Sequence, residues 1–177
     1  MARAFTAIDI PDEVAQRLSR IQEEIGVGKP VRPEKMHVTL EFFQDLSREE
    51  IDQTVESLEG LEFRPFKAKV KGLGVFPSKR FIRVLWAGVD SREVEKLYKR
   101  SCSVTPESDN DHDFRPHITL SRVKDLKRGE KKRVHEALQK YSGKGFGSFK
   151  VDKLRFYRSR LQENGSEYTE LYVKDLG

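Results

Sequence analysis

The chain has 177 residues, of which 36% are hydrophobic, so it can bury the core of a single domain. Its net charge of +5 favours an anionic partner, although the 36% of charged residues are mostly balanced. The single cysteine, Cys102, excludes an internal disulfide and a multi-thiolate metal site, and no apolar run approaches the ~20 residues that span a bilayer.

The N-terminal part of the chain predicts a strand followed by a helix. Residues 3–10 alternate as in a strand and reach an acidic residue early, which is untypical of a signal peptide and predicts a cytoplasmic protein. Apolar residues with helical spacing follow Pro11 and continue to Ile25, and Gly26 is predicted to end this helix.

A second strand is predicted at residues 37–43, where polar and apolar residues alternate with period two. Side chains two residues apart on a strand point the same way, so His37, Thr39 and Glu41 are expected to share one face. The apolar residues of this strand are expected on the opposite face, which leaves the polar face as a candidate site.

The middle of the chain predicts two helices that flank a hairpin. Ser47 and Glu50 form a capping box for a helix that stops near Gly60. Residues 66–75 and 81–89 are predicted to pair as an antiparallel hairpin. Asp90, with an acidic residue three positions later, is predicted to cap the third helix.

The C-terminal part repeats this plan. Its predicted elements are a polar loop at 105–113, a strand at 117–123, a helix at 131–141, a glycine-rich break at 143–147, and strands near 149–157 and 167–173. The final hairpin is predicted to turn at Asn164 and Gly165.

The sequence contains two closely similar tetrapeptides, residues 37–40 (His-Val-Thr-Leu) and residues 117–120 (His-Ile-Thr-Leu). They lie 80 residues apart, close to half of the chain, and each begins a predicted strand that a helix follows. Such approximate duplication predicts a single α+β domain over residues 1–177, with two pseudo-symmetric lobes, antiparallel sheets lining a central cleft, and helices outside.

Each tetrapeptide presents an imidazole beside a hydroxyl on one strand face. Phosphoryl transfer needs a base for the nucleophile and an acid for the leaving oxygen, on opposite sides of phosphorus. His37 and His117 can supply these two groups because imidazole titrates near neutral pH. Thr39 and Thr119 can donate hydrogen bonds to the non-bridging oxygens, where charge builds up. The alternative is that both histidines are buried structural residues.

No metal and no other cofactor are predicted. The only potential metal ligand beside the two motifs is Glu41, and a single carboxylate cannot hold a catalytic ion.

These residues resemble the 2H phosphoesterase superfamily, which is defined by paired His-x-Thr motifs, and most closely its RNA 2′,3′-cyclic phosphodiesterase branch, also described as 2′-5′ RNA ligase-like. The resemblance runs over nearly the whole chain. It includes residues 3–10, 72–77 and 83–89, and residues 115–123 around the second motif. Residues 43–45 depart from the family pattern, which places a glycine at the position of Gln44.

The resemblance implies metal-independent opening of a cyclic phosphate to leave a 2′-phosphate. It implies that His37 donates a proton to the leaving 3′ oxygen and that His117 accepts one from water. It also matches Arg122 to an arginine that often follows the second motif and can pair with phosphate. Arg122 lies an odd number of residues after His117, so strand parity predicts that it points away unless a bulge intervenes.

A wider set of residues is a candidate for contacting an RNA backbone and its bases. The members are Lys79, Arg80, Arg83, Arg155, Arg158, Arg160, Phe76, Phe156 and Tyr157. Ordinary solvated positive faces would account for the same pattern.

The predicted substrates are RNA ends or small cyclic nucleotides, with no membrane and no obligate protein partner. Two further hypotheses involve the same chemistry, on a cyclic phosphate of ADP-ribose or in the reverse 2′-5′ joining reaction. A third is a nucleotide- or RNA-binding module without turnover.

Overall fold

A computed structural model describes residues 1–109 and 113–177. Its helices are α1 (Asp12–Ile25), α2 (Arg48–Glu59), α3 (Arg92–Cys102) and α4 (Arg128–Lys140), with a short 3-10 helix η1 (Pro33–Lys35). Its strands are β1 (Ala2–Asp9), β2 (Lys29–Pro30), β3 (His37–Leu46), β4 (Phe66–Pro77), β5 (Ile82–Asp90), β6 (His117–Arg122), β7 (Gly145–Val151), β8 (Lys153–Gln162) and β9 (Gly165–Asp175). Residues 110–112 of the predicted polar loop lie outside the described residues.

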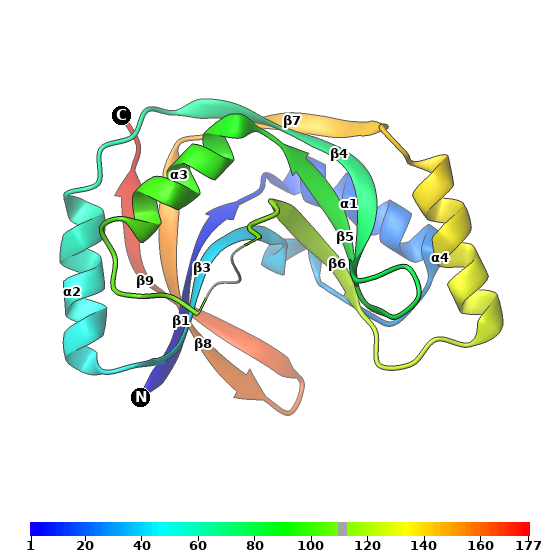
Figure 1. Cartoon of the computed structure of the whole chain (residues 1–177), viewed down its shortest axis with the longest axis horizontal. Coiled ribbons are helices and arrows are strands. Elements are labelled where there is room, and N and C mark those ends of the chain that lie inside the picture. The colour runs from blue at the N-terminus through cyan, green and yellow to red at the C-terminus, as the bar shows by residue number, and fades with distance from the viewer. Residues whose placement is uncertain (110–112) are drawn as a thin grey trace.

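The strands form one curled antiparallel sheet in the order β7-β4-β5-β6-β3-β1-β8-β9, and β2 pairs with β6 (Figure 1). We call β3, β1, β8 and β9 the first lobe, and β6, β5, β4 and β7 the second lobe. The two lobes meet where β3 pairs with β6 at Val38 and Ile118. The α+β fold with two matching lobes is therefore confirmed.

The helices cover the outer face of the sheet, and two of them cross between the lobes. α2 packs against β3 and β9, and α4 packs against β4. α1 follows β1 of the first lobe but packs against β6, β7 and α4 on the second lobe. α3 follows β5 of the second lobe and packs against both β3 of the first lobe and β4 of the second (Figure 1). A continuous apolar core fills the space beneath the helices.

Local sequence signals explain several helix ends. Gly26 ends α1 with φ of 59°, a left-handed conformation that glycine adopts without strain. The capping box of α2 is present, because Ser47 N donates to Glu50 Oε2 at 2.8 Å and Glu50 N donates to Ser47 Oγ at 3.2 Å. Asp90 is not the cap of α3: Ser91 Oγ accepts the hydrogen bond from Val94 N instead.

The C-terminal prediction needs correction where the chain changes lobes. The strand expected near 149–157 is two strands, since β7 pairs with β4 in the second lobe and β8 pairs with β1 in the first. The predicted glycine-rich break extends into β7, which begins at Gly145. The last hairpin turns at Glu163 and Asn164, because Gln162 pairs with Gly165.

Among the described residues, no helix is both long and apolar enough to cross a membrane. The cytoplasmic location stays a prediction.

Candidate active site

The two His-x-Thr strands lie side by side at the centre of the sheet. The antiparallel pairing of Val38 with Ile118 places His37 opposite Thr119 and Thr39 opposite His117. Thr39 and His117 line a cleft of about 500 Å³. Its other lining residues are Leu40, Val75, Phe76, Pro77, Asp113, Phe114 and Arg115. The structure thus brings together the four residues that the motif analysis singled out.

Both histidines are held in the same way by backbone carbonyl groups. His37 Nδ1 lies 2.7 Å from Lys35 O, and His117 Nδ1 lies 2.7 Å from Arg115 O. A carbonyl oxygen only accepts hydrogen bonds, so Nδ1 carries a proton in both rings. Nε2 is therefore the nitrogen that gains or loses a proton, and in His37 it lies 3.0 Å from Thr39 Oγ1.

Burial is the main influence on the pKa of both histidines, and it lowers both values because the low-dielectric surroundings disfavour the charged ring. The hydrogen bond to the backbone carbonyl partly opposes this effect in each ring. The positive charge of Arg122 lowers the pKa of both histidines, and the charge of His117 lowers the pKa of His37. The charge of His117 therefore acts on His37 across the paired strands β3 and β6.

Aromatic rings from neighbouring strands pack against each histidine. The Phe5 ring stacks on His37 with centroids 5.0 Å apart, and the Tyr168 ring meets His37 edge-on at 5.6 Å. Phe76 meets the His117 ring edge-on at 4.9 Å, and Trp86 lies 5.9 Å from it. These contacts fix both ring orientations and remove water from their faces, which accounts for the lowered pKa values.

The register partner of His37 is acidic, whereas the register partner of His117 is a glycine. Asp9 pairs in register with His37, whereas Gly88 occupies the equivalent position opposite His117. The Asp9 carboxylate raises the pKa of His37, partly offsetting burial. Asp9 is held by Arg155 Nε at 2.7 Å and by the Tyr157 hydroxyl at 3.0 Å.

Arg122 lies on the same face as His117, because the bulge that strand parity requires for this orientation is present. Trp86 pairs with Thr119, but the next residue of β5, Leu85, pairs with Ser121, so β6 contains an extra residue. This β-bulge reverses the alternation and turns Arg122 back toward the cleft. The exposed Arg122 side chain acts electrostatically on both histidines.

The same bulge occurs in the first motif and corrects the prediction for Glu41. Ala7 pairs with Thr39 and Thr6 pairs with Glu41, so β3 also gains one residue. Glu41 is therefore turned away from His37 and is fully buried.

Hydroxyl groups surround the buried Glu41 carboxylate. Ser101 Oγ donates to it, as does Thr105 Oγ1 at 2.6 Å. Burial, with the Glu41 charge as a second cause, raises the pKa of the half-buried Cys102 thiol to about 11, so this thiol stays protonated at neutral pH. Among the described residues, no three His, Cys, Asp or Glu side chains gather into a potential metal site.

The wider set of basic and aromatic residues does not form one surface. Phe76 and Tyr157 lie near the histidines, whereas Phe156 is fully buried in the core. Arg155 is engaged by Asp9 and Glu170. Arg158 and Arg160 line a separate pocket beside α2, and Lys79, Arg80 and Arg83 lie at the β4–β5 tip.

Sequence reasoning missed Asp9, Phe5, Trp86 and Tyr168. They belong to strands far from the motifs in the chain, and only the register of the sheet brings them to the histidines. Nothing in the sequence around Asp9, which lies just before α1, indicated that it is beside His37.

A half-barrel sheet with two His-x-Thr strands at its centre defines a phosphoesterase class. The LigT-like phosphoesterase family matches residues 8–86 and 94–168, and the chain belongs to this family.

Curated relatives resemble the chain over its full length. A protein of Archaeoglobus fulgidus is 33% identical over 97% of this chain and 98% of its own length, and one of Aquifex aeolicus is 32% identical over 100% and 98%. Both are named RNA 2′,3′-cyclic phosphodiesterase.

Solved structures agree in fold. The protein TT0787 of Thermus thermophilus superposes with a TM-score of 0.81 at 26% identity, over 98% of this chain and 97% of that one. LigT of Escherichia coli, crystallised with 3′-AMP, gives 0.77 at 23% identity, over 99% and 97%.

Proposed function

We propose that the protein hydrolyses the 2′,3′-cyclic phosphate at an RNA or nucleotide end and leaves a 2′-phosphate. One observation carries the proposal: two imidazoles, each with Nδ1 bound to a backbone carbonyl so that Nε2 is the nitrogen that exchanges protons, lie on the paired strands β3 and β6 beside one cleft. The names of the full-length relatives support the substrate class. Two intact catalytic groups with matching geometry favour an enzyme over a binding module.

The reaction follows from the two imidazoles and the neighbouring donors. His117 Nε2 takes a proton from water as the water oxygen forms a bond to phosphorus. The bond between phosphorus and the 3′ oxygen breaks in line, and His37 Nε2 gives its proton to that oxygen. Thr39, Thr119 and Arg122 stabilise the charge on the non-bridging oxygens.

The difference in charge around the histidines supports this assignment of roles. An acid must begin protonated, and the Asp9 carboxylate favours the protonated form of His37. His117 has Gly88 in the equivalent position, so no carboxylate opposes its neutral form there. The otherwise matching lobes thereby provide one acid and one base.

A product assay tests the function directly. RNA that ends in a 2′,3′-cyclic phosphate should gain the mass of one water, and its end should become sensitive to phosphatase. We expect a 2′-phosphate, as determined by NMR or end-specific enzymes. A 3′-phosphate would reverse the roles of the histidines, and an unchanged RNA end would refute the proposal.

We expect chelators to leave turnover unchanged. Imidazoles, hydroxyls and a guanidinium supply the acid, base and charge stabilisation in the proposed reaction, so no step requires a divalent ion. Turnover should be measured with and without EDTA after extensive dialysis. Activity that disappears in EDTA and returns with a divalent ion would contradict this mechanism.

A further inference from the structure

The excess positive charge of the chain is concentrated at one end of the molecule. Residues 79–83 at the β4–β5 tip and residues 124–132, which lead into α4, contain eight Lys or Arg residues and two acidic residues. Their net charge of +6 exceeds the +5 of the whole chain, so the positive and negative charges of the remaining residues nearly cancel. We call these two segments the basic tip.

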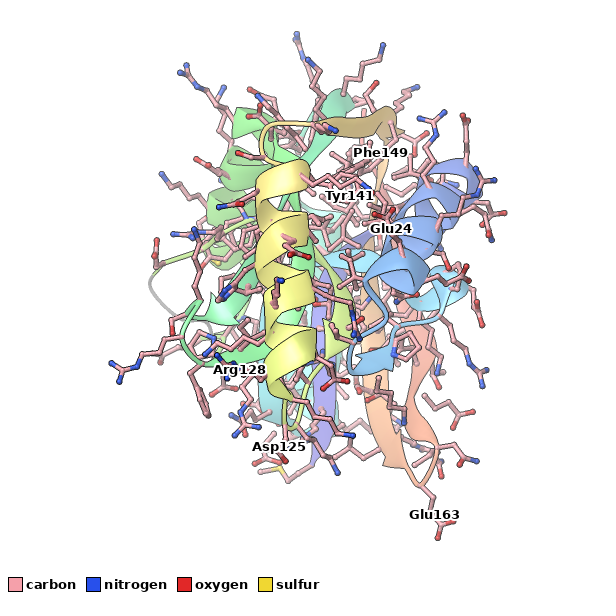
Figure 2. The ribbon with its side chains drawn as sticks, turned by 90° about the vertical axis from the view of Figure 1, so that its right-hand side faces the viewer. Glu24, Asp125, Arg128, Tyr141, Phe149 and Glu163 are labelled. Atoms are coloured by element: carbon pink, nitrogen blue, oxygen red, sulfur yellow. The ribbon has the colours of Figure 1, made fainter. Side chains whose placement is uncertain are left out.

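Hydrogen bonds hold the two segments against each other. Lys131 Nζ donates to Arg80 O at 2.7 Å, and His135 Nε2 lies 3.0 Å from Lys79 O. The Arg83 guanidinium donates to Lys124 O. A pocket of about 180 Å³ lies between the segments. The basic tip is therefore one continuous surface. Figure 2 shows it at the lower end of α4, around Arg128 and Asp125.

Most of the charge at the basic tip is available to an external anion. In the part of the chain that the structure describes, only one of the eight basic side chains forms an ion pair, Lys132 with Glu136 at 3.7 Å. All eight are exposed except Lys131, which is half-buried. α4 begins at Arg128, so its positive dipole end adds to the same field.

An aromatic ring lies among these charges. Phe81 is 55% exposed, which is unusual for a large apolar side chain in this protein. The Arg83 guanidinium lies 4.4 Å from the Phe81 ring centroid and holds one side of the ring. Exposed aromatic rings in basic surroundings bind single-stranded nucleic acids, because the ring stacks on a base while the cations contact phosphates.

The basic tip continues directly from the candidate active site. Phe76 and Pro77 line the cleft together with His117, and Pro77 pairs with Ile82, the neighbour of Phe81. On the adjacent strand, Arg122 pairs with Val84. A substrate strand that leaves the cleft and follows the ends of β4, β5 and β6 therefore arrives at the basic tip.

We propose that the basic tip binds the single-stranded RNA upstream of the cyclic phosphate, with phosphates on its cations and a base on Phe81. This inference rests on the proposed function and narrows the preferred substrate to an RNA chain rather than a mononucleotide. A membrane surface is the less suitable partner, because a single exposed ring offers little apolar area for insertion.

The test compares a tip variant with a matched control of equal charge change. The tip variant is Lys79→Gln/Arg80→Gln/Lys124→Gln, whose side chains make no ion pair among the described residues. The control is Lys67→Gln/Lys69→Gln/Lys150→Gln, exposed residues on β4 and β7 away from the tip. Each is assayed for kcat/KM on a cyclic mononucleotide and on a decamer that ends in a cyclic phosphate.

The tip variant should lose at least roughly tenfold in kcat/KM on the decamer and stay within about twofold on the mononucleotide. We also measure how its affinity for a decamer ending in 2′-phosphate depends on salt. The slope of log K against log salt concentration should be smaller in magnitude by about two, since each lost phosphate contact removes about 0.7 from it. Phe81→Ala should weaken decamer binding about 5- to 100-fold. The control should change little in each assay.

Equal losses in the tip variant and the control, or an unchanged salt slope in the tip variant, would overturn the proposal. So would tip-dependent binding to anionic lipid vesicles with unchanged RNA binding. If the wild-type protein opens no cyclic phosphate, the proposed function fails, whereas the decamer binding assays still decide whether the basic tip binds RNA.

Discussion

Replacing either His37 or His117 by alanine should reduce turnover of a 2′,3′-cyclic phosphate roughly 10²- to 10⁴-fold, the usual contribution of a general acid or base. Both rings are fixed through Nδ1 by a carbonyl and by aromatic neighbours, so their Nε2 atoms need little reorganisation before the reaction. The measurement is kcat and KM on a cyclic mononucleotide, and the loss should fall mainly on kcat.

The double variant should lose much less than the product of the two single losses, because acid and base act in the same step. His135→Ala is the matched control, since this histidine lies on α4 and contacts the carbonyl of Lys79. It should leave turnover of the mononucleotide unchanged. Near wild-type turnover by a folded His37→Ala or His117→Ala variant would refute the two-histidine mechanism.

Asp9→Asn should shift the alkaline limb of the pH profile to lower pH and reduce kcat roughly 10- to 100-fold at neutral pH, part of what the general acid contributes. Asp9 raises the pKa of His37, so its loss lowers that pKa further. His37 then loses its proton at lower pH, and less enzyme has the acid protonated and the base neutral. The acidic limb, which follows protonation of His117, should move little.

Tyr157→Phe provides the control for this variant. It removes the hydroxyl that donates to Asp9 but keeps the carboxylate and its ion pair with Arg155. The alkaline limb should therefore stay near its wild-type position. An Asp9→Asn profile that falls uniformly at all pH values would assign Asp9 a structural role only.

The sequence was sufficient to predict the two lobes and the shared faces of the four motif residues, because each of these signals is local. The period of two around each motif holds from the histidine to the threonine, so His37 with Thr39 and His117 with Thr119 share a face as predicted. Capping residues likewise defined the start of α2. These features depend on neighbours within a few residues.

Prediction failed beyond the threonines because both bulges place two consecutive residues in the core. Leu40 and Glu41 are both buried in β3, as are Leu120 and Ser121 in β6. The period of two placed Glu41 on the same face as His37, and only the pairing with the neighbouring strand shows the extra residue. The same register explains why Asp9 escaped notice and why the face of Arg122 depended on a bulge that the sequence does not show.

The crossing of α1 and α3 between the lobes limits how the two halves can move. Each lobe has part of its core closed by a helix that follows a strand of the other lobe, so separating the lobes would expose apolar surface on both. The spacing between the imidazoles is then set when the chain folds rather than when substrate arrives. Native-state hydrogen exchange should accordingly release the central amides of β1 and β5 in one shared opening event, the behaviour of a single cooperative folding unit.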